Sequence, residues 1–381
     1  MNAGQRLKIG FIPLADAASL FVAVDKRFAA AEGLDVELVR EVSWSNIRDR
    51  LAIGHYDAAH LLAPMAVAST LGLSHVKLPI VGAFNLASNG NAITLSPDLY
   101  ARMRDVAEGD LSDPSVSARA LKAVVEERDK RNAEPLTFGM TFPFSTHNYQ
   151  LRYWMAEGGV NPDADLRLVV LPPPYMVENL AKGQVDGFCV GAPWNAVAAD
   201  KGVGVILHPG CAIFNPAPEK TLALRTQFAE RDPLLVEALI RACLKAADFV
   251  KATENRDEVA ALLARPDRVG VEREALRRTL DGRLGAGAES KDYLLFGDRA
   301  NGRPDRYQAA WLYAQMLRWG QAKFSPEQLR VAESVFTPTF FDAAAGVASE
   351  TGTQPIRAFA GAAFEKDIKS YLSAFAIGAK C

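Results

Sequence analysis

The sequence predicts an α/β protein of two lobes with mainly parallel sheets, followed by a helical C-terminal third. Its 381 residues exceed one ordinary domain of about 100–200 residues. Up to residue 225, short apolar runs alternate with helical patterns, which is typical of βαβ units. After Pro218, helical patterns dominate. The composition, 49% hydrophobic and 23% charged, is globular and excludes disordered, collagen-like and coiled-coil chains.

The strands expected from apolar runs bounded by turn residues lie at 7–12, 34–39, 58–62, 77–84, 91–96, 137–140, 166–171, 186–190, 203–207 and 221–225. The helices expected from 3.6-residue periodicity and stop signals include 145–157, 177–182, 233–253, 256–264, 271–279, 306–319 and 325–335. The polar stretch from Pro97 to Pro135 is expected to form surface helices.

Two crossovers, near 85–90 and near 208–218, are candidates for a double hinge between the lobes. They divide the chain into a first lobe of residues 1–88 and 212–381, which includes the helical extension, and a second lobe of residues 89–211. We therefore expect the chain to cross between the lobes twice.

Charge and motif content exclude several function classes. Forty-three Lys and Arg against 45 Asp and Glu leave no basic excess for a phosphate backbone, so nucleic acid is not expected as a direct ligand. The four cysteines are far apart, which fits neither a zinc framework nor a disulfide scaffold and suits a reducing compartment. No phosphate loop, dinucleotide fingerprint, HExxH or GxSxG motif occurs. We expect no catalytic residue, no cofactor and no metal.

The N-terminal residues predict a cytoplasmic chain. The first apolar run ends at Pro13 and is followed by Asp16, unlike the longer apolar core of a secretory signal. No run approaches the ~20 apolar residues of a membrane span, so membrane insertion is not expected.

Three expected helix starts directly follow strand ends, at residues 43–45, 144–147 and 191–194. A helix N-terminus exposes unpaired N–H groups and partial positive charge, which favours an anion. Ligands of open α/β sheets bind at the carboxyl ends of strands. Such turns also occur in any α/β protein, so the pattern by itself leaves an ordinary structural role open.

A series of short motifs in fixed order narrows the possibilities. It comprises LKIGFIP at 7–13, SW at 43–44, APM at 63–65, NGNAI at 89–93, TFP and TH at 141–147, PPP at 172–174, GFCVG at 187–191, PWN at 193–195 and PEK at 218–220. Over residues 7–225, this order resembles the nitrate/bicarbonate-binding proteins of ABC uptake systems, and more narrowly the cytoplasmic NasS-type nitrate/nitrite sensors.

The resemblance implies a two-lobe periplasmic-binding-protein fold of type II, with one planar anion between the lobes. Carried over motif by motif, the ligand-binding residues are Trp44, Asn91, His147, Pro173, Val190, Gly191 and Lys220. An indole wall, an amide, an imidazole and a backbone N–H suit the flat nitrate ion, and Lys220 would balance its charge. Bicarbonate-binding relatives have an acidic residue and calcium in that region, so Lys220 favours nitrate or nitrite.

Each carried-over side chain also fits an ordinary role. Trp44 suits a hydrophobic core, His147 a locally satisfied helix start, Lys220 a surface salt bridge and Asn91 a turn after glycine. His60, in a strand pattern, is expected behind the ligand residues or in the core rather than as a ligand.

The leading hypothesis is a cytoplasmic, non-catalytic nitrate/nitrite sensor. The resemblance implies a protein partner, a NasT-type RNA-binding antiterminator that the ligand-free sensor holds inactive. The alternative is the substrate-binding component of an ABC uptake system for nitrate or a related anion. Enzymes of thiamine pyrimidine synthesis share the fold, but their cysteine-rich iron motif does not match these dispersed cysteines.

Overall fold

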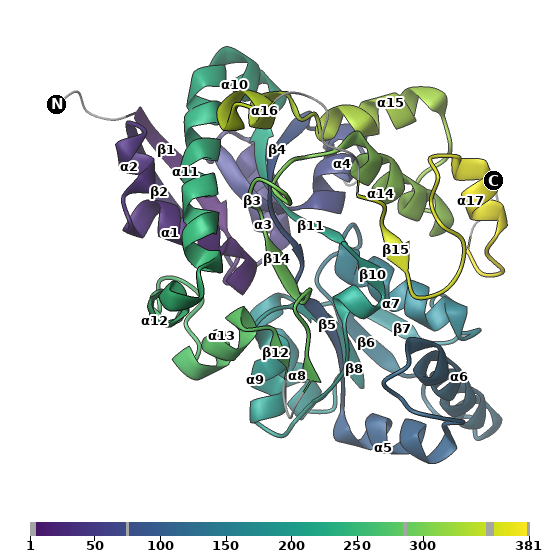
Figure 1. Ribbon diagram of the computed structural model, residues 1–381. Helices are drawn as coiled ribbons and strands as arrows, with labels where there is room; N and C mark the ends of the chain where they lie inside the picture. Colours follow the sequence, from purple (N-terminus) through teal and green to yellow (C-terminus); the bar gives the residue numbers. More distant parts are fainter. Residues whose placement is uncertain (1–4, 74–75, 285–287, 348–353, 379–381) are drawn as a thin grey trace.

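The computed structural model describes residues 5–73, 76–284, 288–347 and 354–378. Two separate β-sheets organise the chain, and we call the parts built on them the first and the second lobe (Figure 1). This matches the expected two-lobe α/β architecture. The exact lobe limits at 88/89 and 211/212 stay a prediction.

The first lobe contains a six-stranded sheet in the order β14-β4-β11-β3-β1-β2. Its strands are β1 (Gln5–Phe11), β2 (Leu34–Arg40), β3 (Ala58–Leu62), β4 (Ile80–Asn89), β11 (Pro218–Arg225) and β14 (Leu294–Phe296). The strands β1 to β4 run in one direction, whereas β11 and β14 oppose them.

The second lobe contains a five-stranded sheet in the order β7-β6-β8-β5-β9. Its strands are β5 (Asn91–Leu95), β6 (Thr137–Met140), β7 (Arg167–Val170), β8 (Gly187–Gly191) and β9 (Val205–Pro209). Here only β5 opposes the rest. Each sheet is therefore mainly parallel, as expected, with an antiparallel strand where the chain enters from the other lobe: β11 in the first sheet and β5 in the second.

Helices cover both sheets, as expected for βαβ connections. Those of the first lobe up to β4 are α1 (Ala18–Asp25), α2 (Phe28–Ala31), α3 (Trp44–Ala52) and α4 (Ala63–Leu71). Those of the second lobe are α5 (Pro97–Val106), α6 (Pro114–Lys130), α7 (Thr146–Glu157), α8 (Met176–Ala181) and α9 (Trp194–Asp200). The expected surface helices between Pro97 and Pro135 are α5 and α6, and α6 also buries an apolar face.

The C-terminal third is largely helical, as predicted. Its helices are α10 (Thr226–Arg231), α11 (Pro233–Lys251), α12 (Arg256–Leu263), α13 (Arg273–Leu280), α14 (Arg306–Arg318), α15 (Pro326–Val335), α16 (Thr339–Ala345) and α17 (Ile368–Ser373). The long helix α11 packs its apolar face against α1 and α16, whereas α14 and α15 pack on α4 (Figure 1).

Two pairs of short strands were not predicted from the sequence, and one of them joins this third to the second crossover. The strand β15 (Arg357–Ala358) pairs with β10 (Phe214–Asn215), and β12 (Arg283–Leu284) pairs with β13 (Ala288–Glu289). Two- and three-residue strands carry no periodic signal, so sequence reasoning could not find them.

The first crossover is a single residue. β4 continues to Asn89, and β5 begins at Asn91, with Asn89 and Gly90 both at positive φ. The strand predicted at 77–84 was therefore placed too early and ended too soon. Three of the last five residues of β4, Asn85, Ser88 and Asn89, are polar, which is typical of a loop. They are nevertheless buried and paired with β11 and β14 inside the sheet.

Among the described residues, no helix is both long enough and apolar enough to cross a membrane.

Candidate functional site

Two helix starts predicted from sequence bring polar side chains to the junction between the lobes. Ser43 caps α3, accepting a hydrogen bond from Asn46 N at 3.2 Å, and Ser145 caps α7, accepting from Asn148 N at 3.1 Å. These caps fix the first helical turn of each lobe's helix. Trp44 is thereby presented from the first lobe and His147 from the second.

Five buried ionisable side chains meet at this junction. We call Asp16, His60, His147, Glu219 and Lys220 the charged cluster. The Lys220 ammonium lies 2.6 Å from Glu219 Oε1 and 3.0 Å from Asp16 Oδ2. His60 Nε2 lies 2.9 Å from Asp16 Oδ1, and His147 Nδ1 lies 3.5 Å from Glu219 Oε1. All five side chains are at most 1% exposed, so the cluster is shielded from bulk water.

Trp44 forms an aromatic wall of this cluster. Its ring centroid lies 5.5 Å from Lys220 Nζ and 5.6 Å from the centroid of the His60 ring. Trp44 is 1% exposed. The predicted indole and the predicted ammonium therefore share one buried site, as the anion-binding hypothesis requires.

Asn91 is held by a chain of amides whose orientation can be deduced. Gln150 Nε2 donates to the carbonyl of Gly210 at 3.1 Å, so Gln150 Oε1 faces Asn91. Asn91 Nδ2 then donates to Gln150 Oε1 at 3.0 Å and to Glu219 Oε2 at 2.8 Å. Both amide protons are thus used within the protein. The expected role of Asn91 as a donor to the anion is not met in this structure, where its remaining atom is an acceptor.

Several buried polar atoms of the site lack a hydrogen-bond partner among the described residues. They include Trp44 Nε1, His147 Nε2, His60 Nδ1 and Asn91 Oδ1. Both Asp16 oxygens and His60 Nε2 also make no hydrogen bond there, although they lie in the ionic contacts given above. An unsatisfied buried polar group costs about 1–3 kcal/mol, so such a concentration indicates a place where a ligand or water completes the bonding.

The pKa values follow from burial and from the neighbouring charges. Burial raises the pKa of the Asp16 carboxyl, but Lys220 and His60 outweigh this and hold that pKa at about 2. Burial lowers the pKa of His147 to about 4 despite the nearby Glu219 carboxyl, and burial also lowers the pKa of His60. The pKa of Lys220 is raised, because Asp16 and Glu219 outweigh its burial. At neutral pH the lysine is therefore charged and both imidazoles are neutral.

Lys220 does not act as a free cation, in contrast to the sequence-based expectation. The carboxyl groups of Asp16 and Glu219 already contact its ammonium. Neither acid was predicted from the sequence to be a site residue. Glu219 lies in the recognised PEK motif, and Asp16 interrupts an apolar stretch after β1, which was the available signal. His60, expected behind the ligand residues or in the core, is part of the cluster.

The other predicted residues differ in how close they lie to the cluster. Gly191 pairs with Asn91 across β8 and β5, and a Cβ added at Gly191 would lie 3.5 Å from both Asn91 Oδ1 and Asp16 Oδ2. Val190 is its neighbour in β8, and its carbonyl accepts from Asn195 Nδ2 at 2.7 Å. Pro173 is buried at the start of a 3₁₀ turn, Pro173–Tyr175, and none of the described contacts joins it to the cluster. The ligand-binding role of these residues stays a prediction.

Further contacts close the lobes over the cluster. Thr146 Oγ1 donates to the carbonyl of Pro218 at 2.5 Å, and Trp194 Nε1 donates to the carbonyl of Pro13 at 3.2 Å. Ala15 N donates to the carbonyl of Ala192 at 2.9 Å. These bonds join segments of different sheets, which explains why the cluster is inaccessible in this conformation.

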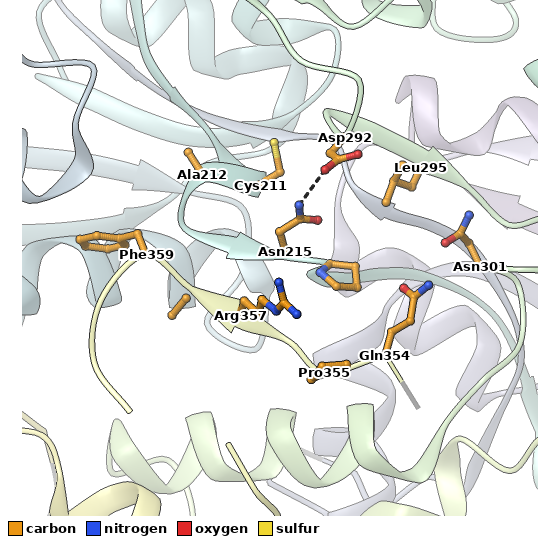
Figure 2. A pocket seen from close by; sticks show the side chains of 12 residues that line it. Cys211, Ala212, Asn215, Asp292, Leu295, Asn301, Gln354, Pro355, Arg357 and Phe359 are labelled. Carbon is orange, nitrogen blue, oxygen red and sulfur yellow. Dashed lines mark hydrogen bonds between the residues drawn. The ribbon is translucent and has the colours of Figure 1, made fainter. Parts of the chain in front are cut away.

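A cavity of about 610 Å³ lies away from the charged cluster, beside the second crossover (Figure 2). Asn215 and Asp292, joined by a hydrogen bond of 2.9 Å, and the exposed Arg357 line it. It is open and contains none of the cluster residues. The cavity therefore shares no lining residue with the charged cluster.

Comparison with known proteins identifies the family. Residues 3–264 match the model described as the NMT1-like family. The chain belongs to this family. The nitrate/nitrite binding protein NrtA of Nostoc sp. PCC 7120 is 31% identical over 341 residues, which cover 87% of this chain and 73% of that protein. The crystal structure of the periplasmic nitrate-binding protein NrtA from Synechocystis PCC 6803 matches with a TM-score of 0.89 at 27% identity, over 98% of this chain and 99% of the other.

These matches confirm the resemblance to nitrate/bicarbonate-binding proteins and the two-lobe periplasmic-binding-protein fold. The nitrate import ATP-binding protein NrtC of Synechocystis sp. PCC 6803 is 35% identical over 342 residues, which cover 88% of this chain and 49% of NrtC. This chain thus spans about half the length of NrtC. The two NrtA relatives are named as nitrate-binding proteins, in agreement with the prediction of a non-catalytic protein.

Proposed function

We propose that this NMT1-like chain binds one small planar oxyanion, nitrate or nitrite, between its lobes and serves as the binding component of an ABC uptake system. The observation that carries the proposal is a pair of buried, unpartnered ring nitrogens. Trp44 Nε1 comes from the first lobe and His147 Nε2 from the second, and Trp44 stands beside the Lys220 ammonium.

The geometry suits such an ion on physical grounds. A flat, weakly hydrated anion accepts hydrogen bonds in its plane from donors such as an indole N–H and an imidazole N–H. Donors from opposite lobes bind the same ion only when the lobes are closed, so binding stabilises the closed form. The names of NrtA and of the ATP-binding protein NrtC support nitrate as ligand and a transporter as partner.

Thermal melting with nitrate, nitrite, bicarbonate and an alkanesulfonate tests the ligand, because a ligand bound only by the folded state raises the melting temperature. We expect nitrate or nitrite to raise it, and the Lys220→Ala variant to lose the response. A response to the sulfonate alone, or to none of the four ions, contradicts the proposal.

The second candidate is a cytoplasmic sensor that controls a NasT-type RNA-binding antiterminator of nitrate-assimilation genes. The order of motifs over residues 7–225 favours it. In this case nitrate and the antiterminator bind antagonistically, each weakening the other by the same factor. Calorimetric titration with nitrate, with and without the antiterminator, distinguishes the candidates: equal nitrate affinity in both titrations removes the sensor mechanism and leaves the transport role.

A further inference from the structure

The charged cluster holds more negative than positive charge before any anion enters. Lys220 contributes one ammonium, and Asp16 and Glu219 contribute two carboxyl groups in contact with it. Glu219 accepts hydrogen bonds through both oxygens, from Lys220 and from Asn91, as a carboxylate does. With both imidazoles neutral, a bound nitrate would bring a second excess negative charge into a buried site, where charges interact strongly.

Glu219 occupies the point where the lobes meet. It lies in β11, directly after the second crossover, and belongs to the first sheet. Its Oε2 accepts from Asn91 of the second sheet at 2.8 Å, and its Oε1 lies 3.5 Å from His147 Nδ1 at the start of α7. This carboxylate therefore faces two groups that approach it only when the lobes close.

The groups around His147 decide where a proton would be held. Glu219 and Lys220 face it from β11, and Asp16 from the 3₁₀ turn after β1; the two acids favour the charged imidazole and Lys220 opposes it. Thr141 Oγ1, after β6, lies 3.1 Å from Nδ1. On the other side of the ring, Nε2 faces no partner among the described residues. His60, from β3, already has Nε2 against Asp16.

We propose that Glu219 determines how the oxyanion binds: its excess charge makes entry of the anion depend on uptake of one proton from solvent by His147. The imidazolium then directs Nδ1–H toward Glu219 and Thr141, and Nε2–H toward the anion. The added proton cancels the added negative charge, so the cluster has the same net charge with and without ligand. This inference rests on the proposed function, because it requires that an oxyanion binds at this site.

Wild-type protein tests the proton uptake directly. Titration calorimetry with nitrate in two buffers of different ionisation enthalpy, at about pH 6, is expected to show close to one proton taken up per nitrate. Nitrate affinity is expected to weaken about 10- to 100-fold between about pH 5.5 and about pH 7.5, because uptake of one proton changes the affinity about tenfold per pH unit. Nitrate does not protonate in this range, so the change reports the protein.

The Glu219→Gln variant tests the origin of the effect. Gln removes the excess charge but keeps one acceptor oxygen where Glu219 offers two, one to Lys220 and one to Asn91, so one of these donors loses its bond. We expect affinity that is nearly independent of pH, and binding at about pH 7.5 at least as tight as in the wild type. A merely structural role would instead weaken binding at both pH values. The matched control is Glu157→Gln on α7, which pairs with Arg318 outside the cluster and is expected to retain the wild-type pH dependence.

The outcomes separate the two proposals. If no oxyanion binds at any pH, the proposed function fails. If nitrate binds to the wild type with no proton uptake and constant affinity, or if Glu219→Gln keeps the wild-type pH dependence, the proton-linked role of Glu219 is overturned while the oxyanion site stands.

Discussion

Two buried groups of tryptophan and histidine side chains occur in this protein, and their bonding differs. In the second lobe, Trp154 Nε1 donates to Ser117 Oγ at 3.0 Å, and His208 Nε2 lies 2.6 Å from the same oxygen. At the lobe junction, Trp44 Nε1 and His147 Nε2 face no partner in the described parts of the chain. Burial lowers the pKa of His208 and of His147 alike, to about 4 in each.

The comparison shows which property of the junction group supports the proposal of a ligand site. Burial and a lowered histidine pKa occur in both groups, so neither distinguishes structure from function. The hydrogen bonding differs between the two groups. Trp154 and His208 both bond to Ser117 and stabilise one lobe, whereas Trp44 and His147 come from two lobes and leave ring nitrogens free to bond a ligand. The charged residues Asp16, Glu219 and Lys220 occur only beside the second group.

The largest expected effect comes from removing the cation at the junction. Lys220→Met leaves Asp16 and Glu219 buried without a counter-charge, which is expected to lower the free energy of unfolding by about 3–5 kcal/mol and to abolish the nitrate-induced rise in melting temperature. Denaturant unfolding with and without nitrate measures both. Lys245→Met, at a half-exposed pair with Glu32, is the control and is expected to cost less than about 1 kcal/mol. Equal losses in the two variants would contradict the central role of Lys220.

The second prediction compares the two indoles. Trp44→Phe removes an N–H that has no protein partner, so nitrate affinity is expected to fall about 10- to 100-fold while stability changes little beyond the lost ring area. Trp154→Phe removes the bond to Ser117, so it is expected to cost about 1 kcal/mol of stability beyond the lost ring area, with nitrate affinity retained. Calorimetric binding and denaturant unfolding on both variants test this pair. A loss of affinity in Trp154→Phe would show that the groups are not separate.

The smallest expected effect concerns the pH dependence of stability. An unfolded chain binds protons at histidine below about pH 6.5, whereas folded His208 and ligand-free His147 stay neutral down to about pH 4. Stability is therefore lost as pH falls, by on the order of 1 kcal/mol for each histidine between about pH 6.5 and about pH 5.5. Saturating nitrate is expected to remove the part of this stability loss that comes from His147. The His208→Gln variant is expected to remove the part that comes from His208. A nitrate-independent slope would indicate that His147 stays neutral when the anion binds.

Much of the fold follows from local sequence. The strand Ala58–Leu62 and the strand Thr137–Met140 have the predicted bounds, because a continuous apolar run between turn residues specifies a buried strand. The helices at 145–157 and 306–319 were placed within one residue, since serine or aspartate caps mark where they begin. The end of β4 was missed because its polar residues are paired only with strands distant in sequence.

The residue types at the site were present in local motifs, and the family resemblance of those motifs selected Trp44, His147 and Lys220 as residues of one site. Tertiary structure decided what surrounds them. Asp16 and Glu219 contact Lys220, and the amide protons of Asn91 are directed away from the anion position, only because two sheets meet at one junction. The charge balance and the hydrogen-bond directions of the site depend on every group that packs there. Those groups come from segments far apart in the sequence, so no local pattern predicts them.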